Sequence, residues 1–139
     1  AAALQAEQLA EHADFLSVGT NDLSQYTLAM DRDHAGLAAR VDALHPALLR
    51  LIAMTCAGAA VHKRWVGVCG ALASDPLATP VLIGLGVTEL SVSPVQIGEI
   101  KDRVRQLHEA ECQRLSLDLL KLNSAAAVRQ ACHLHWPLH

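Results

Sequence analysis

The chain has 139 residues, of which 52% are hydrophobic and 3% aromatic, and its formal net charge is −3. This length fits one domain with a core built mainly from leucine, alanine and valine. The small negative charge argues against a general nucleic-acid or membrane-surface binder. No apolar run approaches the roughly 20 residues of a membrane-spanning helix.

The cysteines and the N-terminus bear on the cellular compartment. Cys56, Cys69, Cys112 and Cys132 form no C-x-x-C pair and suggest no disulfide framework, so we expect free thiols and a cytoplasmic protein. The chain begins at Ala1 in a helix-forming stretch without the basic and apolar regions of a signal peptide. We therefore expect a piece of a longer protein.

Short apolar segments alternate with helix-forming segments in the first half of the chain. In order, we predict a helix over residues 1–13, a buried strand over 14–18 that ends at Gly19, a helix over 21–30, one helical turn near 37–41, and a helix that begins at Pro46. The apolar face of this last helix has helical spacing and consists of Leu48, Leu49, Ile52, Cys56 and Ala59.

The second half repeats the alternation. It predicts a buried strand over residues 65–69, a helix capped by Asp75 and ending near residue 85, a short strand over 89–92, and a helix from Pro94 to about residue 108. Ser93 and Gln96 have the spacing of a capping box. Residues 109–139 keep a helical pattern with a break near 123–124.

This order predicts an α/β fold with a parallel sheet, because strands that alternate with helices are joined by right-handed crossovers. Three strand–helix units do not close a barrel. They fit the C-terminal portion of a (β/α)8 TIM-type barrel, which typically needs roughly 250 residues. Residues 1–139 would then be a fragment of one barrel domain, with extra C-terminal helices over 109–139.

Polar residues follow two of the predicted strands, where sites form in parallel α/β folds. Asp22 is a hard oxygen ligand that suits Mg²⁺, and the Asn21 amide can donate hydrogen bonds to a phosphate. Arg32 can fork onto phosphate or carboxylate oxygens. Cys69 could be an acid, a nucleophile or a small buried hydrophobe. If the two strands are neighbours, Asp22 and Cys69 open into the same mouth.

Each of these residues also has an ordinary structural interpretation. Asn21 and Asp22 alone indicate a helix cap more often than a metal site, Arg32 alone is usually a surface charge, and Cys69 alone is usually structural. Their joint placement makes the functional and structural interpretations about equally strong.

The segment S-V-G-T-N-D-L-S-Q-Y-T-L-A-M-D-R, residues 17–32, resembles the signature of the phosphoenolpyruvate-utilising enzymes. The resemblance continues through H-P-A-L-L-R-L-I, W-V-G-V-C-G and L-G-V-T-E-L-S-V-S-P, and covers most of residues 12–108. The resemblance is greatest to the branch of the family that phosphorylates proteins. This branch comprises enzyme I of the phosphoenolpyruvate:sugar phosphotransferase system and the multiphosphoryl transfer proteins. Pyruvate phosphate dikinase and phosphoenolpyruvate synthase are the alternatives within the family.

The resemblance implies roles for four residues. Asn21 and Asp22 would bind phosphoenolpyruvate (PEP), with Asp22 also ligating Mg²⁺, and Arg32 would hold the phosphoryl group. Cys69 would be the acid that protonates the enolate of pyruvate. The phosphoryl group would pass to a histidine on a separate domain and then to a histidine-containing phosphocarrier protein. Family members dimerise through this domain, so the resemblance also implies a homodimer.

The chain departs from the family at Ala71, where C-G-E is the usual pattern. This departure removes a carboxylate close to Cys69. It also supports a third alternative, a degenerate regulatory or assembly module of the same fold. The family's second metal carboxylate, further arginines and phosphorylated histidine have no counterpart here. We therefore expect the isolated chain to be inactive.

The last eight residues, C-H-L-H-W-P-L-H, contain His133, His135 and His139. Histidine is a common metal ligand, but no carboxylate lies nearby in the sequence and chain ends are usually loose. A disordered terminus is the favoured interpretation, with a metal site as the alternative.

Overall fold

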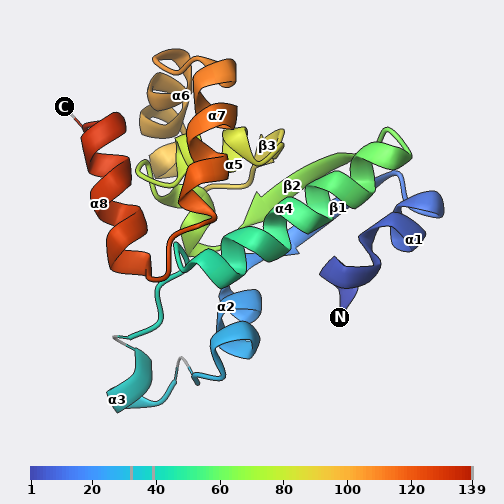
Figure 1. Cartoon of the computed structure of the whole chain (residues 1–139), viewed down its shortest axis with the longest axis horizontal. Coiled ribbons are helices and arrows are strands. Elements are labelled where there is room, and N and C mark those ends of the chain that lie inside the picture. The colour runs from blue at the N-terminus through green and yellow to red at the C-terminus, as the bar shows by residue number, and fades with distance from the viewer. Residues whose placement is uncertain (32, 39, 139) are drawn as a thin grey trace.

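The structure, a computed structural model, describes residues 1–31, 33–38 and 40–138 (Figure 1). The strands of the described part are β1 (Phe15–Gly19), β2 (Trp65–Cys69) and β3 (Glu89–Leu90), which form one parallel sheet in the order β1-β2-β3. This confirms the predicted α/β class and the parallel sheet.

Helices precede, separate and follow the strands in the predicted order (Figure 1). The α-helices are α1 (Ala6–Glu11), α2 (Thr20–Leu28), α3 (Ala35–Ala38), α4 (Pro46–Val61), α5 (Thr79–Gly84), α6 (Ile97–Arg105), α7 (Glu109–Leu119) and α8 (Ala125–His135). Short 3₁₀ helices cover Ala2–Gln5, Ala71–Ser74 and Pro94–Gln96. No helix in the described ranges is long and apolar enough to cross a membrane.

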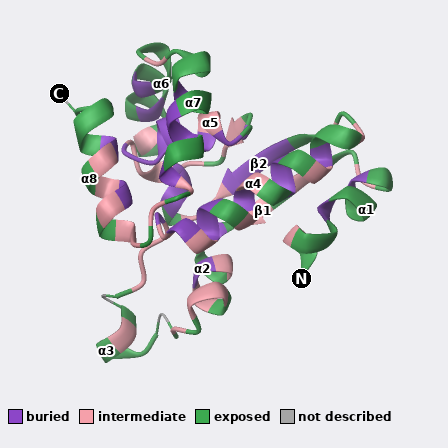
Figure 2. Cartoon of the chain, viewed as in Figure 1, coloured by how far each residue is buried: buried purple, intermediate pink, exposed green. Residues whose placement is uncertain are grey.

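Helix α4 begins where the sequence predicts. His45 caps it by accepting a hydrogen bond from the Ala47 N–H at Nδ1, and Pro46 occupies the first turn. The predicted apolar face is confirmed, because Leu48, Leu49, Ile52, Cys56 and Ala59 are all buried. Figure 2 shows buried residues where α4 lies along β1 and β2, and also in α5 and α7.

The two longer strands differ in burial. Val66, Gly67 and Val68 of β2 are buried, as predicted. The prediction of a buried β1 was wrong, since Phe15 and the alternate residues after it are exposed while Leu16 and Val18 pack against the core. β1 is an edge strand, and one of its faces lacks cover in the described chain.

The boundaries of β3, α5 and α6 differ from the predicted ones. Strand β3 ends at Leu90, although the Ser91 N–H still donates to the Val68 carbonyl at 2.9 Å. Helix α5 begins at Thr79, after a turn in which the Asp75 carboxylate accepts the Leu77 N–H. The predicted capping box does not form.

The reason lies in the two side chains concerned. The Ser93 hydroxyl donates to the Gln96 side chain at 2.7 Å instead of accepting a backbone N–H. The chain then makes a 3₁₀ turn before α6, which ends at Arg105 rather than near residue 108.

The C-terminal region is ordered through its helices. The predicted break falls between α7 and α8, where Ser124 caps α8 by accepting the Ala127 N–H at 3.2 Å. The prediction of a disordered terminus was wrong for His133 and His135, which lie in α8. Trp136 is buried, and Arg103 donates to its carbonyl oxygen at 2.6 Å, so packing and hydrogen bonding hold this end. His139 lies outside the described residues.

Candidate functional site at the carboxyl edge of the sheet

The ends of β1 and β2 lie side by side. Gly19 and Cys69, the last residues of the two strands, are register partners. The chain turns into α2 after Gly19 and into a 3₁₀ helix after Gly70. The predicted polar segments therefore meet at one edge of the sheet, the edge that carries sites in parallel α/β folds.

Thr20 and Asn21 tie the two strand ends together. The Thr20 hydroxyl donates to the Cys69 carbonyl at 2.7 Å, and the Thr20 side chain is fully buried. Oδ1 of Asn21 accepts the backbone N–H of Ala71 at 3.0 Å. Because that N–H can only donate, the contact fixes which end of the amide faces the turn, and the NH₂ end faces away from it.

Gly70 makes this close approach sterically feasible. Its φ is +92°, a backbone conformation that residues other than glycine rarely adopt. A Cβ added there would lie 2.7 Å from Oγ1 of Thr20 and 2.9 Å from Oδ1 of Asn21. The turn after β2 thus depends on glycine for both its backbone angle and its space.

Cys69 differs from the other cysteines in its environment. It is half-buried at the strand end, and its Sγ lies 3.7 Å from the Val18 carbonyl. Cys56, Cys112 and Cys132 are buried and free, and burial raises the pKa of Cys56 and of Cys132 to about 12. Those two thiols stay protonated, which fits a structural role.

Asp22 lies beside Asn21 but faces a different space. It is exposed in the first turn of α2 and lines a cavity of about 400 Å³ together with Gly19 and Tyr26. Asn21 instead lines a cavity of about 390 Å³ with Ala71. The structure therefore joins Asn21 to the Cys69 turn, while a common mouth for Asp22 and Cys69 stays a prediction. Arg32 lies outside the described residues.

The donor set at this edge can hold part of a metal site. Within residues 1–31, 33–38 and 40–138, no three histidine, cysteine or acidic side chains converge as a metal cluster. Mg²⁺ commonly takes one or two protein carboxylates and completes its shell with water and substrate phosphates. The Asp22 carboxylate fits as one such ligand.

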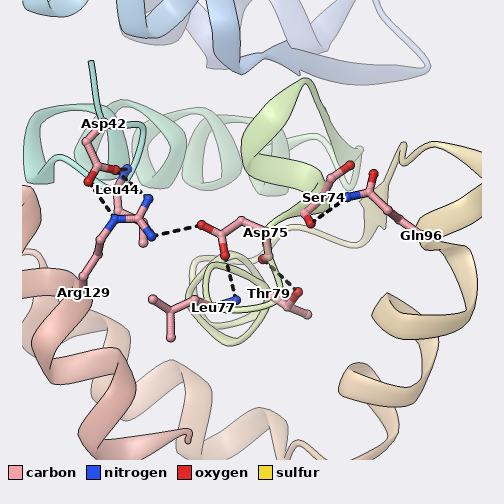
Figure 3. Close-up of polar contacts among 8 residues, drawn as sticks. All are labelled: Asp42, Leu44, Ser74, Asp75, Leu77, Thr79, Gln96 and Arg129. Atoms are coloured by element: carbon pink, nitrogen blue, oxygen red, sulfur yellow. Dashed lines mark hydrogen bonds and ion pairs between the residues drawn. The ribbon is translucent and has the colours of Figure 1, made fainter. Parts of the chain in front are cut away.

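A half-buried ion-pair network, drawn in Figure 3, was missed in the sequence. Arg129 of α8 pairs with Asp42 at 2.7 Å and with Asp75 at 3.2 Å. All three side chains line the same 390 Å³ cavity as Asn21. No local sequence signal marks them, since the partners are 87 and 54 positions apart.

The network sets the charge state of its members. Burial raises the pKa of Asp42, but hydrogen bonds from Arg129 and from the Leu44 N–H outweigh it and hold the pKa below its ordinary value. The Asp42 hydrogen bond in turn raises the pKa of Arg129. Both shifts favour the charged forms of Asp42 and Arg129 near neutral pH.

The fold and this edge define an α/β protein with a candidate anion- and metal-binding site at the ends of parallel strands. Residues 1–109 match the PEP-binding domain of the PEP-utilising enzymes, and the chain belongs to that family. Three curated relatives illustrate the similarity.

A multiphosphoryl transfer protein of Xanthomonas campestris pv. campestris is 53% identical over 129 residues, which cover 93% of this chain and 15% of the relative. A phosphoenolpyruvate-protein phosphotransferase of Mycoplasma genitalium is 43% identical over 129 residues, 93% of this chain and 23% of the relative. A phosphoenolpyruvate-dependent phosphotransferase system protein of Escherichia coli is 41% identical over 121 residues, 87% of this chain and 16% of the relative. The chain thus spans less than a quarter of each of these relatives.

Proposed function

We propose that this chain is the PEP-binding part of a phosphoenolpyruvate-protein phosphotransferase. The complete enzyme passes the phosphoryl group of PEP to one of its own histidines, and then to a histidine-containing phosphocarrier protein that serves sugar uptake. The observation that carries the proposal is the junction of Asn21 with the Cys69–Ala71 turn, in a chain of this family. The relatives named above are called a multiphosphoryl transfer protein or phosphotransferase proteins, which favours this function over a dikinase or synthase.

In this proposal the three strands are part of a (β/α)8 TIM-type barrel. Support comes from the parallel order β1-β2-β3 and from the exposed face of β1, which further strands would cover. Residues 1–108 belong to the barrel and residues 109–139 form its helical extension. A homodimer in the cytoplasm completes the proposal, and light scattering of the complete protein tests the dimer.

Asn21, Asp22 and Arg32 bind the phosphorylated end of PEP in the proposed site. The Asn21 NH₂ group, which faces away from the turn at Ala71, donates to a phosphate oxygen. The N-terminus of α2 adds its backbone N–H groups and its dipole to the same anion site. Asp22 supplies a carboxylate for Mg²⁺, which when bound would neutralise developing charge on the phosphoryl group. Arg32 adds a positive charge to that group.

Cys69 is the proposed proton donor. When the phosphoryl group leaves PEP, the remaining enolate gains a proton on its methylene carbon to become pyruvate. The Cys69 thiol gives that proton, and the thiolate regains one from solvent. Its half-buried position at the strand end, in contrast to the buried Cys112 and Cys132, supports this role.

A degenerate regulatory or assembly module is the second candidate function, and Ala71 is the observation that favours it. Its methyl group stands where the family usually places a carboxylate, two residues after the proposed acid. The retained Asn21, Asp22, Arg32 and Cys69 favour the enzyme.

A label-transfer assay tests the proposed activity. The complete protein is incubated with PEP labelled in its phosphoryl group and with a histidine-containing phosphocarrier protein. We expect Mg²⁺-dependent labelling of the carrier, slow pyruvate formation after Cys69→Ala, and no transfer by the 139-residue chain alone. Wild-type pyruvate formation by Cys69→Ala would refute the role of the thiol, and transfer by the isolated chain would refute its dependence on other domains.

A further inference from the structure

We propose that Arg129 is a positioning residue that fixes the positions of two loops of the PEP site relative to each other. This inference rests on the proposed function. One loop follows α3 and contains Asp42. The other follows the Cys69 turn and contains Asp75. Arg129 reaches both from α8, an element that follows the matched residues 1–109.

The guanidinium makes three contacts to the two loops (Figure 3). Nε donates to Oδ2 of Asp42 at 2.7 Å, and Nη2 donates to Oδ1 of Asp42 at 2.9 Å. Nη1 donates to Oδ2 of Asp75 at 3.2 Å. The planar fork of arginine fixes the angle between its donors, so the two carboxylates are held at a set position relative to each other.

Both carboxylates are also hydrogen-bonded to the backbone of their own loops. Oδ1 of Asp42 also accepts the Leu44 N–H at 3.0 Å, and Oδ1 of Asp75 accepts the Leu77 N–H at 2.9 Å. These local hydrogen bonds join each side chain to its own turn. A displacement of the guanidinium therefore displaces the turns and not only the side chains.

The two loops lead directly to the proposed site. Asp75 follows the 3₁₀ helix Ala71–Ser74, whose first residue donates to Asn21. Asp42 lies on the segment that connects residue 32, the proposed phosphoryl ligand, to α4. Asn21, Ala71 and the ion-pair network line one cavity of about 390 Å³. The network thus lines the same cavity as the two residues that join the strand ends.

Arg129 acts from a fixed support. Ser124 caps the start of α8, and Val128 and Cys132 are fully buried on either side of Arg129. At the far end, Arg103 donates to the carbonyl oxygens of Trp136 and Pro137 at 2.6 and 3.2 Å. A helix held at both ends can hold the more exposed loops in place.

The network is partly shielded from water. The side chains of Arg129, Asp42 and Asp75 are 39%, 27% and 24% exposed, respectively. Pairs of this kind add little to overall stability when they are exposed, but their geometry is specific. We therefore expect loss of Arg129 to act more on substrate binding than on folding.

Kinetics of the complete protein test the proposal. Arg129→Met should raise the KM for PEP by about tenfold to a hundredfold, because a small misplacement of a positioned group has effects of this size. Arg129→Lys keeps the charge but loses the fork and should recover only part of the affinity. Asp75→Asn should raise KM less than Arg129→Met.

Arg50→Met is the matched control. Arg50 also joins distant elements, because its Nε and Nη2 donate to the Leu120 carbonyl at 2.9 and 2.6 Å. Neither of these hydrogen bonds joins a loop of the proposed site. Arg50→Met should lower the Tm and leave the KM for PEP unchanged. If Arg129→Met lowers the Tm like this control and keeps the wild-type KM, the positioning role is overturned.

Amide hydrogen exchange of the complete protein gives a readout that does not need activity. The Ala71 N–H should exchange faster in Arg129→Met than in Arg50→Met, because its bond to Asn21 depends on the held turn. Equal exchange at Ala71 in both variants would overturn the proposal. If Arg129→Met does not fold, the exchange rate of the Ala71 N–H in Arg129→Lys and in Asp75→Asn is compared with that in Arg50→Met.

The two proposals fail differently. A wild-type protein that transfers no phosphoryl group from PEP would refute the proposed function and, with it, the role of Arg129 in that site. A wild-type protein that is active, with wild-type KM in Arg129→Met and Asp75→Asn, would refute the positioning role alone.

Discussion

Oδ1 of Asn21 accepts the backbone N–H of Ala71 at 3.0 Å, across 50 positions of sequence. This contact joins the first turn of α2 to the turn after β2, and it leaves the NH₂ end of the amide for a ligand. Asn21 therefore has two roles in our account, one in the fold and one in binding. Two substitutions can separate them.

Asn21→Asp keeps an acceptor for the Ala71 N–H but replaces the amide donor with a negative charge. We expect near wild-type stability and PEP affinity lower by at least about tenfold, since a hydrogen bond to a charged group is worth about 1.5–3 kcal/mol. Asn21→Ala should lose the affinity and also about 1 kcal/mol of stability. Urea unfolding and calorimetric titration check the pair. Wild-type affinity in Asn21→Asp would contradict the binding role.

Gly70→Ala should destabilise the turn after β2. The positive φ and the contacts of an added Cβ with Thr20 and Asn21 predict a loss of about 1–3 kcal/mol in the free energy of unfolding. Gly98→Ala is the matched control, because a Cβ there meets nothing within 4 Å, and it should be neutral or up to about 1 kcal/mol stabilising. Equal free energies for the two variants in urea would show that the turn tolerates a side chain.

Asp42→Asn should change how stability depends on pH. The pKa of Asp42 in the folded chain lies below its ordinary value of 3.8, so the unfolded state binds more protons there. The contribution of Asp42 to the free energy of unfolding is complete above pH 3.8, the ordinary pKa. It is lost as the pH falls from there through the lower pKa of the folded chain. Asp42→Asn and Arg129→Met should therefore be less stable than wild type at pH 7, with the difference shrinking below about pH 4. Unfolding curves parallel to wild type from pH 7 to 3 would contradict this.

Ala71→Glu tests the departure of this chain from the family pattern. A carboxylate at position 71 enters the cavity beside Asn21 and can relay a proton to Cys69. We expect pyruvate formation by the complete protein to rise by about tenfold to a hundredfold, within or below the usual contribution of an acid–base group. Ala71→Gln, which has similar size and no charge, should give little increase. An unchanged rate in Ala71→Glu would show that the missing carboxylate does not limit the enzyme.

The sequence predicts those elements whose causes are local. Helix α4 follows from the proline in its first turn and from apolar residues at helical spacing, and strand β2 follows from a short apolar run that ends at glycine. The burial of β1 could not be predicted, because an apolar run does not reveal whether its strand lies at a sheet edge. The capping box near Ser93 failed because two polar side chains bonded to each other, a choice that spacing alone does not decide.

Some residues of the candidate site could likewise be predicted from the sequence, and others could not. Asn21 and Cys69 are found from the sequence because Asn21 lies two residues after the end of β1 and Cys69 ends β2. The bond from Ala71 to Asn21 and the pairing of Arg129 with Asp42 and Asp75 depend on how α8 and the loops pack. Such contacts join residues at least 50 positions apart, and no periodic pattern in the sequence encodes them.

The most direct test of the central claim is a calorimetric titration of PEP into the complete protein, with and without Mg²⁺. We expect binding that requires Mg²⁺ and is lost in Asp22→Ala, while Glu99→Ala, which removes another exposed first-turn carboxylate, binds like wild type. Mg²⁺-dependent binding of wild-type strength in Asp22→Ala would contradict the claim that this chain provides the PEP site.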